Sequence, residues 1–255
     1  MSNLLLEVQG FYIFGRFIAW YGVIIALGML LGLISACVVC KDKGYNRNMP
    51  INIAIYAIPL AILGARLYYC IFTDTNTFSH FFDISQGGMA IYGGVIGGFL
   101  GLVICCLIHK YSILQACDVA VPSLILGQAI GRIGCYFSGC CYGVETTIES
   151  LKVFPISTIQ DDGLWHYATF FYESVLNLIT YVILMVLTYT TDKRGIATGS
   201  YLVGYGIIRA VLEQFRDPKE SLELIQGSGI RVSQLLSIIL IVIGVCTIIL
   251  VNIKK

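Results

Sequence analysis

Charged residues are scarce in this sequence. Only 12% of the 255 residues are Asp, Glu, Lys or Arg, whereas 57% are hydrophobic and the mean hydropathy is strongly positive. So little charge excludes a soluble enzyme and indicates a polytopic membrane protein. The net charge of +1 carries no further information, and no nucleic-acid partner is expected.

Several other features are absent. No basic segment precedes Phe11, and the first apolar run is long enough to cross a membrane, so a cleaved signal peptide is not expected. No internal repeat and no low-complexity linker divides the chain. We therefore interpret residues 1–255 as one domain.

Long apolar runs predict an all-α fold with seven transmembrane helices. They cover roughly 17–40, 50–72, 87–108, 115–137, 168–190, 197–215 and 230–251, each near the 20 residues that a membrane requires. The fourth and sixth are the weakest predictions, because each carries an arginine and several glycines.

The distribution of lysine and arginine predicts the orientation. Eight of these residues alternate onto one side, which the positive-inside rule makes the cytoplasmic side. They are Lys41, Lys43, Arg47, Lys110, Lys193, Arg194, Lys254 and Lys255. The N-terminus is then outside and the C-terminus cytoplasmic. The longest connection, residues 139–167, is expected to form an extracytoplasmic cap that is too short to be a domain.

Ionisable residues inside the apolar stretches are the strongest functional clue. On this topology Arg16, Arg66, Arg132 and Arg209 all lie toward the outer ends of their helices, with Glu173 and Glu213 nearby. A charge in hydrocarbon costs about 2.5–3.5 kcal/mol on insertion scales, so it is rarely present without a partner or a function. Four cations against two carboxylates leave surplus positive charge for an anionic ligand. The alternative is a basic and aromatic belt at the membrane interface, with side chains that snorkel.

The third predicted helix is rich in glycine. The spacings Gly93-x-x-x-Gly97 and Gly94-x-x-x-Gly98 predict a face along which another helix packs closely. The glycine pairs that flank Met89–Tyr92 indicate a broken helix end or a backbone close to a ligand. Such a helix N-terminus would offer free N–H groups to an anion.

The densest group of unusual residues is the run from Gly131 to Gly143. It reads Gly-Arg-Ile-Gly-Cys-Tyr-Phe-Ser-Gly-Cys-Cys-Tyr-Gly. An arginine at this position can grip a phosphate with two parallel hydrogen bonds, and the glycines allow tight turns beneath it.

The same run resembles the hallmark of the bacterial prolipoprotein diacylglyceryl transferases, Gly-Arg-x-Gly-Asn-Phe-x-Asn-Gly-Glu-x-x-Gly. Further motifs resemble this family in order along the whole chain. They are Trp20-Tyr21-Gly22, Gly64-Ala65-Arg66-Leu67, Gly87-Gly88-Met89-x-x-Tyr92-Gly93-Gly94-x-x-Gly97, Tyr172-Glu173, Gly204-Tyr205-Gly206-x-x-Arg209-x-x-x-Glu213-x-x-Arg216 and Ser233-Gln234.

The resemblance implies a reaction. Members of the family transfer the diacylglyceryl group of phosphatidylglycerol to the thiol of the lipobox cysteine in a prolipoprotein. A thioether forms and glycerol phosphate leaves. The expected protein is thus a multi-pass enzyme of the bacterial cytoplasmic membrane. Its partners are phosphatidylglycerol, the signal peptide of a prolipoprotein and the surrounding membrane lipid, and no cofactor or metal is expected.

The resemblance also implies roles for particular residues. Arg132 and Arg209 would hold and neutralise the phosphate, as catalytic groups that act electrostatically on the leaving group. Tyr21 would orient the headgroup or the leaving group, and Glu213 would fix Arg209. The other positions expected to bind substrate are Arg66 and Gly143.

Three of this chain's departures from the family pattern matter for the chemistry. Tyr92 stands where the family has a histidine, and Cys135 and Cys140 stand where it has asparagine and glutamate. We expect Tyr92 to be the catalytic group at its position, although a tyrosine with an ordinary pKa near 10 is a poor base at neutral pH. Either this is a divergent branch with altered proton handling, or the chemistry has changed.

Ten cysteines and three histidines complete the list of candidates. Seven cysteines lie in apolar segments and are interpreted as packing residues. Cys135, Cys140 and Cys141 lie beside Arg132, where small packing residues, a disulfide and a reactive or metal-binding thiol all remain open. The absence of a nearby histidine argues against zinc. The histidines, His80, His109 and His166, fall in predicted loops and are interpreted as surface residues.

Two other functions remain open. One is a transporter for an anion or a lipid headgroup, with the arginines along its path. The almost wholly apolar inner halves of several predicted helices, such as Ile24–Leu33 and Leu178–Leu187, favour a site open to one leaflet instead. The other is a non-catalytic relative of the transferases, suggested by Tyr92.

Overall fold

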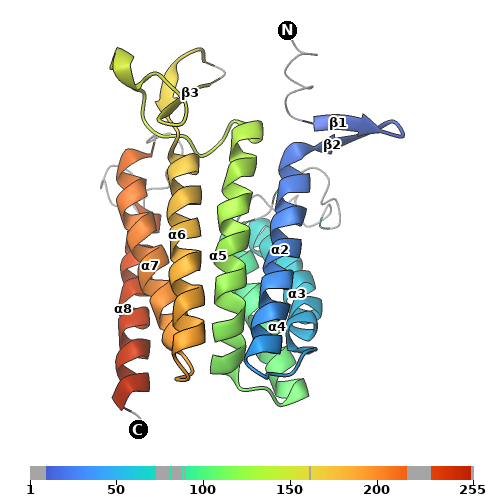
Figure 1. Cartoon of the computed structure of the whole chain (residues 1–255). Helices are drawn as coiled ribbons and strands as arrows, with labels where there is room; N and C mark the ends of the chain where they lie inside the picture. The colour runs from blue at the N-terminus through green and yellow to red at the C-terminus, as the bar shows by residue number, and fades with distance from the viewer. Residues whose placement is uncertain are drawn as a thin grey trace. The chain divides into compact units, whose positions relative to one another are not determined.

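The computed structural model describes residues 10–72, 81, 88, 90–160, 162–216 and 231–253. All seven apolar segments predicted from the sequence form helices (Figure 1). These are α2 (Trp20–Asp42), α3 (Met49–Phe72), α4 (Ile91–His109), α5 (Ile113–Ser138), α6 (Thr169–Thr190), α7 (Ile196–Leu212) and α8 (Val232–Ile253).

Six of these helices are long and apolar enough to cross a membrane, among the residues that the structure describes. The chain is therefore an all-α polytopic membrane protein, as predicted. The exception is α7, which has 17 residues and ends at Leu212. A short 3₁₀ helix, η4 (Glu213–Phe215), continues it over the rest of the predicted segment.

A hairpin replaces the start of the first predicted helix. Strands β1 (Gly10–Ile13) and β2 (Arg16–Ala19) pair in antiparallel fashion. Phe14 and Gly15 close the turn with φ angles of 48° and 76°, outside the helical region. The helix begins only at Trp20. The prediction that Arg16 lies at the end of a helix is therefore wrong, since it opens a strand.

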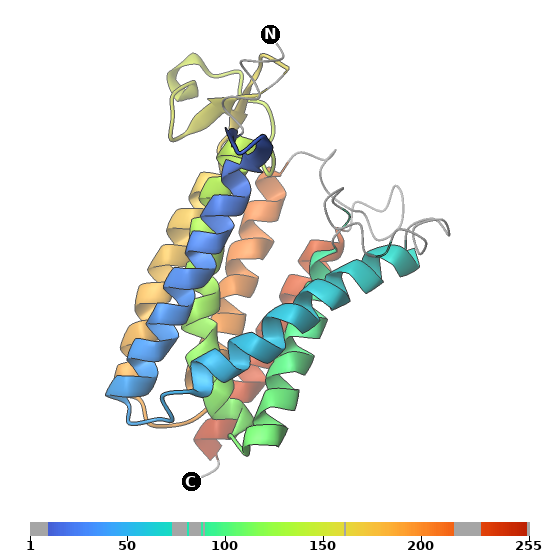
Figure 2. The ribbon, with the colours of Figure 1, turned by 90° about the vertical axis from the view of Figure 1, so that its right-hand side faces the viewer.

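The chain divides into two compact units, Met1–Ser35 with Val121–Lys255 and Ala36–Ala120. In the second unit, α3 and α4 pack side by side (Figure 2). A Cβ atom built on Gly93 would lie 2.2 Å from the carbonyl oxygen of Gly64, and one on Gly97 would lie 2.1 Å from that of Leu60. Only glycine allows the two backbones to approach this closely, which confirms the predicted packing face.

The start of α4 differs from the prediction by several residues. The helix begins at Ile91, because Gly88 has a φ of 76° that an α-helix cannot contain. The structure therefore has the expected break before Tyr92. Two members of the glycine motif, Gly87 and Met89, lie outside the described residues.

In the first unit, α6 packs against α7 and α7 packs against α8 (Figure 1). Ser174 of α6 donates a hydrogen bond to the carbonyl oxygen of Ala129 in α5 at 2.7 Å, which ties these two helices together. Gly199 and Gly244 let α7 and α8 approach, since a Cβ on Gly244 would lie 2.7 Å from the carbonyl oxygen of Gly199. A buried apolar cluster fills the space between α5, α6 and α7, with Ile125 and Leu184 fully buried. Helix α5 is thereby held with its last turns beside α6 and α7.

The segment predicted as a cap, residues 139–167, carries its own small structure. It contains the 3₁₀ helix η3 (Glu149–Leu151) and a hairpin of β3 (Ser157–Ile159) and β4 (Trp165–Tyr167). The hydroxyl of Tyr172 in α6 donates to the carbonyl oxygen of Ile156 at 2.5 Å and anchors the hairpin to the helix.

The prediction that His166 is an ordinary surface residue in a loop is wrong. It lies in β4 with 4% of its surface exposed. Its Nδ1 lies 3.0 Å from the carbonyl oxygen of Gly143, and its Nε2 lies 3.0 Å from the carboxylate of Asp162. Both partners only accept hydrogen bonds, so the ring makes both bonds when both nitrogens carry hydrogen. Of the other two histidines, His109 is the exposed last residue of α4, and His80 lies outside the described residues.

Candidate functional site

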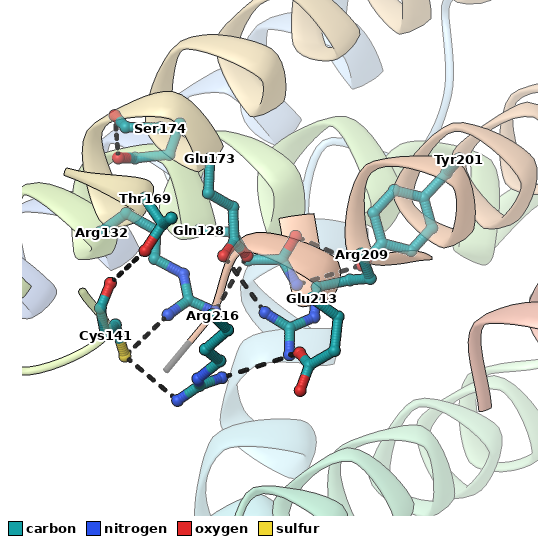
Figure 3. A network of polar contacts seen from close by, with 11 residues as sticks. Gln128, Arg132, Cys141, Thr169, Glu173, Ser174, Tyr201, Arg209, Glu213 and Arg216 are labelled. Carbon is teal, nitrogen blue, oxygen red and sulfur yellow. Dashed lines mark hydrogen bonds and ion pairs between the residues drawn. The ribbon is translucent and has the colours of Figure 1, made fainter. Parts of the chain in front are cut away.

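Three helices contribute ionised side chains to one network (Figure 3). Arg132, near the end of α5, forms an ion pair of 2.9 Å with Oε1 of Glu173 in α6. Arg209 of α7 contacts Oε2 of the same carboxylate at 3.2 Å and the carboxylate of Glu213 at 3.1 Å. Glu173 therefore bridges two guanidinium groups that lie 77 positions apart in the sequence, at residues 132 and 209. The expected pair of Arg209 and Glu213 is present.

The pairing follows from helical spacing and burial. Arg209 and Glu213 are four residues apart, which places them on one face where α7 runs into η4. Glu173 and Glu213 are 4% and 2% exposed. Removing a carboxylate from water is costly unless a cation compensates for it, so each buried acid fixes the position of at least one guanidinium.

Arg216 joins the same network from a position just after the sixth predicted helix. Its Nη1 lies 4.0 Å from the carboxylate of Glu213, and its Nη2 donates to the sulfur of Cys141 at 3.8 Å. Arg132 donates to the same sulfur at 3.2 Å. Arg231 donates to the carbonyl oxygens of Glu213 and Arg216 and holds this turn in place. The spacing Glu213-x-x-Arg216 was the signal that could have identified Arg216.

Local backbone contacts explain how residues 141 and 216 meet. Gly143 and Arg216 form an isolated antiparallel β-bridge, and Val144 donates to the carbonyl oxygen of Phe215 at 2.9 Å. A Cβ on Gly143 would lie 2.6 Å from that same oxygen, so glycine is required for the approach. Thr169 donates to the carbonyl oxygen of Cys141 at 2.8 Å and links this turn to the first residue of α6.

These side chains surround one cavity. Its lining consists of Arg132, Cys141, Thr169, Glu173, Arg209, Leu212, Glu213 and Arg216. Three guanidinium groups and two carboxylates leave one positive charge in surplus. Oε1 of Glu173 lies 2.9 Å from the Arg132 guanidinium but makes no well-directed hydrogen bond. The arrangement is suited to an anionic group.

Three cysteines lie at the edge of this network. The sulfur atoms of Cys135, Cys140 and Cys141 all lie within 4.8 Å of one another, and none of the three forms a disulfide with another described residue. Hydrogen bonds from the other two thiols, and then the charges of Arg132 and Arg216, hold the pKa of Cys141 below its ordinary value. This residue lies after the end of α5, in a left-handed backbone conformation with φ of 61°. The sulfur of Cys141 thus lies at the cavity in contact with two guanidinium groups.

The other predicted site residues have contacts of their own. Tyr21 is the second residue of α2, and the Cβ position of Gly134 lies 3.0 Å from its ring. Arg66 and Tyr92 belong to the unit Ala36–Ala120. Arg66 is 5% exposed and donates to the carbonyl oxygens of Phe81 and Gly88 at 3.0 and 2.9 Å. Tyr92 lies at the start of α4 with its ring 6.2 Å from that of Tyr68.

Comparisons with known proteins agree with these features. Residues 10–250 match the sequence profile of the family described as prolipoprotein diacylglyceryl transferase. The chain is 39% identical to the phosphatidylglycerol–prolipoprotein diacylglyceryl transferase of Clostridium botulinum strain Langeland, over 92% of this chain and 93% of that protein. It is 36% identical to an enzyme of the same name from Listeria monocytogenes, over 93% of this chain and 87% of that protein.

Proposed function

The chain belongs to the prolipoprotein diacylglyceryl transferase family, and we propose that it transfers the diacylglyceryl group of phosphatidylglycerol to the thiol of a prolipoprotein cysteine. The thiol loses its proton to water or to a phosphate oxygen, and its sulfur forms a thioether with the glycerol carbon. The bond from that carbon to the phosphate oxygen breaks, and glycerol phosphate leaves with the electron pair. The whole chain, residues 1–255, acts as a single transferase domain.

The observation that supports this function is the convergence of Arg132, Arg209 and Arg216 on one cavity with only two carboxylates. A phosphodiester carries one negative charge, which equals the surplus positive charge of these five groups. The charge on the leaving phosphate grows as the carbon–oxygen bond breaks. Positioned cations stabilise that developing charge more than they stabilise the bound substrate, and this difference lowers the barrier.

We assign roles to the remaining predicted residues on the same basis. Arg132 and Arg209 are the catalytic cations, and Glu213 holds Arg209 in place. Gly143 supports substrate binding through its bridge to Arg216, which keeps that guanidinium at the cavity. Tyr21 and Arg66 contribute to headgroup binding, and Tyr92 contributes a hydroxyl at the position of the family's histidine.

The distribution of lysine and arginine supports a proposed orientation of the chain in the membrane. The chain crosses the bacterial cytoplasmic membrane seven times, with α7 as the sixth and shortest span. The N-terminus and residues 139–167 are extracytoplasmic, which is the side on which a secreted precursor presents its lipobox cysteine. The C-terminus is cytoplasmic.

The test is a transfer assay with the purified chain, phosphatidylglycerol and a synthetic peptide that contains a lipobox cysteine. The peptide should gain the mass of one diacylglyceryl group. Arg132→Ala and Arg209→Ala should each lower the rate about 100-fold or more, the usual cost of removing a group that stabilises transition-state charge. Arg194→Ala removes an exposed arginine and serves as the control.

The result also separates the alternatives. A transporter would move labelled headgroup across vesicles without adding mass to the peptide. A non-catalytic relative would bind phosphatidylglycerol and leave the peptide unchanged. Full activity of the Arg132→Ala variant would remove the assigned role of that residue.

A further inference from the structure

We propose that Cys135, Cys140 and Cys141 bind one soft d¹⁰ metal ion, with Zn²⁺ as the first candidate, and that its remaining coordination position binds the acceptor thiol. The first half depends only on the geometry of the three sulfur atoms. The second half rests on the proposed transferase function.

The ligands are arranged by the end of α5. Cys135 is buried in the helix, and Gly139 and Cys141 have φ angles of 59° and 61°, which turn the chain back on the helix end. This reversal brings the three sulfur atoms within 4.8 Å of one another. Thiolates are soft ligands that select Zn²⁺ or Cu⁺. The sequence argument against zinc was the absence of histidine, but three converging thiolates form a ligand set without one.

Hydrogen-bond donors surround two of the three sulfur atoms. Arg132 and Arg216 donate to the sulfur of Cys141 at 3.2 and 3.8 Å, and the hydroxyl of Ser138 contacts the sulfur of Cys140 at 3.1 Å. Hydrogen bonds to ligand atoms orient them and tune the metal, so these groups form a suitable outer shell.

One coordination position remains for a substrate. Zinc sites that act on substrates commonly have three protein ligands and one exchangeable position. The group consists of three ligands among the residues that the structure describes, and one of them, Cys141, lines the cavity with the three arginines. An ion at the sulfurs would therefore lie beside the proposed phosphate site.

Binding there would activate the acceptor. A thiol that coordinates a metal ion loses its proton, which passes to water. The bound thiolate then attacks the glycerol carbon, a carbon–sulfur bond forms, and the electron pair of the broken carbon–oxygen bond leaves on glycerol phosphate. No electron is transferred to or from the metal. This step needs no histidine at the position of Tyr92.

The first experiment measures metal binding without activity. The full chain, purified in detergent with a phosphine reductant and no chelator, is titrated with Co²⁺ and followed by visible absorption. We expect about one ion per chain, displaced by Zn²⁺. Cys135→Ser, Cys140→Ser and Cys141→Ser should each weaken binding at least about tenfold. Cys246→Ser makes the same chemical change at an exposed cysteine of α8 and is the matched control.

The second experiment tests the open position. A lipobox peptide added to the Co²⁺ form should change its visible spectrum, and a peptide with serine in place of cysteine should not. No stoichiometric Co²⁺ binding, or a disulfide between any two of the three cysteines in active protein purified without a reductant, would overturn the metal site. Full transfer by metal-free protein would overturn the activation step and leave the proposed function intact. Metal binding with the expected spectral change but no transfer would count against the proposed function alone.

Discussion

At the scale of single residues, each carboxylate of the site contacts two guanidinium groups. Glu173 contacts Arg132 and Arg209 with its two oxygens, and Glu213 contacts Arg209 and Arg216. Neither carboxylate belongs to one arginine alone. The guanidinium groups are thereby oriented before any ligand enters, which reduces the entropy that binding must overcome.

Glu173→Gln tests this arrangement. The substitution keeps the size of the side chain and removes its charge, so Arg132 and Arg209 lose their common counter-ion. We expect the free energy of unfolding to fall by about 3–5 kcal/mol, the usual cost of breaking a buried ion pair. The rate of transfer should fall at least tenfold, or about 1.4 kcal/mol, because the two cations are no longer aligned. Thermal unfolding in detergent and the peptide assay measure these effects.

Glu149→Gln is the matched control. Glu149 pairs with Lys152 at the surface, where 85% of its side chain is exposed. The same chemical change there should leave both measurements unaltered. Equal losses of stability and transfer rate in the two variants would show that the carboxylate of Glu173 has no special role in the site.

Sequence reasoning found part of this residue set. Arg132, Arg209 and Glu213 stand out because charge in an apolar helix is unusual. The pairing of Glu213 with Arg209 is implied by the resemblance to the family. The position of Arg216 depends instead on a bridge to Gly143, which is 73 residues away by numbering, and no local pattern encodes such a contact. His166 was misjudged for the same reason, since its burial is created by a hairpin and a distant carbonyl group.

At the scale of elements, close contact between backbones determines how α3 and α4 pack. Gly97→Ala would place a Cβ atom 2.1 Å from the carbonyl oxygen of Leu60, and neither backbone can move aside without separating the helices. We expect a loss of about 1–3 kcal/mol in the free energy of unfolding, typical of overpacking. Chemical or thermal unfolding in detergent measures it.

Gly98→Ala lies one residue along the same helix and makes the same change. Its Cβ would lie 3.5 Å from that of Ala61, an ordinary contact. This variant should stay within about 0.5 kcal/mol of the native protein. Similar losses in the two variants would show that glycine content, rather than the packing face, matters.

The β3–β4 hairpin gives a second prediction at this scale. His166→Ala removes the side chain that links the carbonyl oxygen of Gly143 to the carboxylate of Asp162. We expect faster amide hydrogen exchange in residues 143–167, with little change in the transmembrane helices. Unchanged exchange in this segment would show that the backbone pairing of Gly143 with Tyr167 holds the hairpin in place without His166.

The same contact predicts a pH dependence. The backbone N–H of Leu164, and then His166, hold the pKa of Asp162 below its usual value. A carboxylate with a lowered pKa stabilises the fold above the pKa of an unfolded aspartate, about 3.9, and this contribution is lost as the pH falls through the lowered value. Exchange in the hairpin should therefore increase below about pH 4 in the native protein and not in Asp162→Asn.

At the scale of the whole molecule, the membrane decides most of the fold. Every apolar run that was predicted is a helix, because backbone groups in hydrocarbon must be paired within the segment. The helix ends were less predictable. The turn at Phe14 and Gly15 and the left-handed Gly88 moved the first residues of α2 and α4, and such turns depend on conformations that hydropathy does not encode.

The orientation of the whole molecule is a further prediction. Green fluorescent protein fused after Lys255 should fluoresce, because it folds in the cytoplasm, whereas alkaline phosphatase fused there should be inactive. The reverse result would place the arginine cavity at the cytoplasmic end and would contradict access by a secreted precursor. Exchanging Lys41 and Lys43 for glutamine in the same fusion tests whether the first basic loop determines the outcome.

The bridging carboxylate has one more consequence. Glu173 occupies the same guanidinium groups that the phosphate would use, so it acts as an internal competitor for the anion. When a product departs, the two arginines do not become bare charges, since this neighbour re-forms its contacts at once. The product phosphate is then released more easily, although the anionic substrate is bound less tightly. An enzyme that turns over many times benefits from this balance.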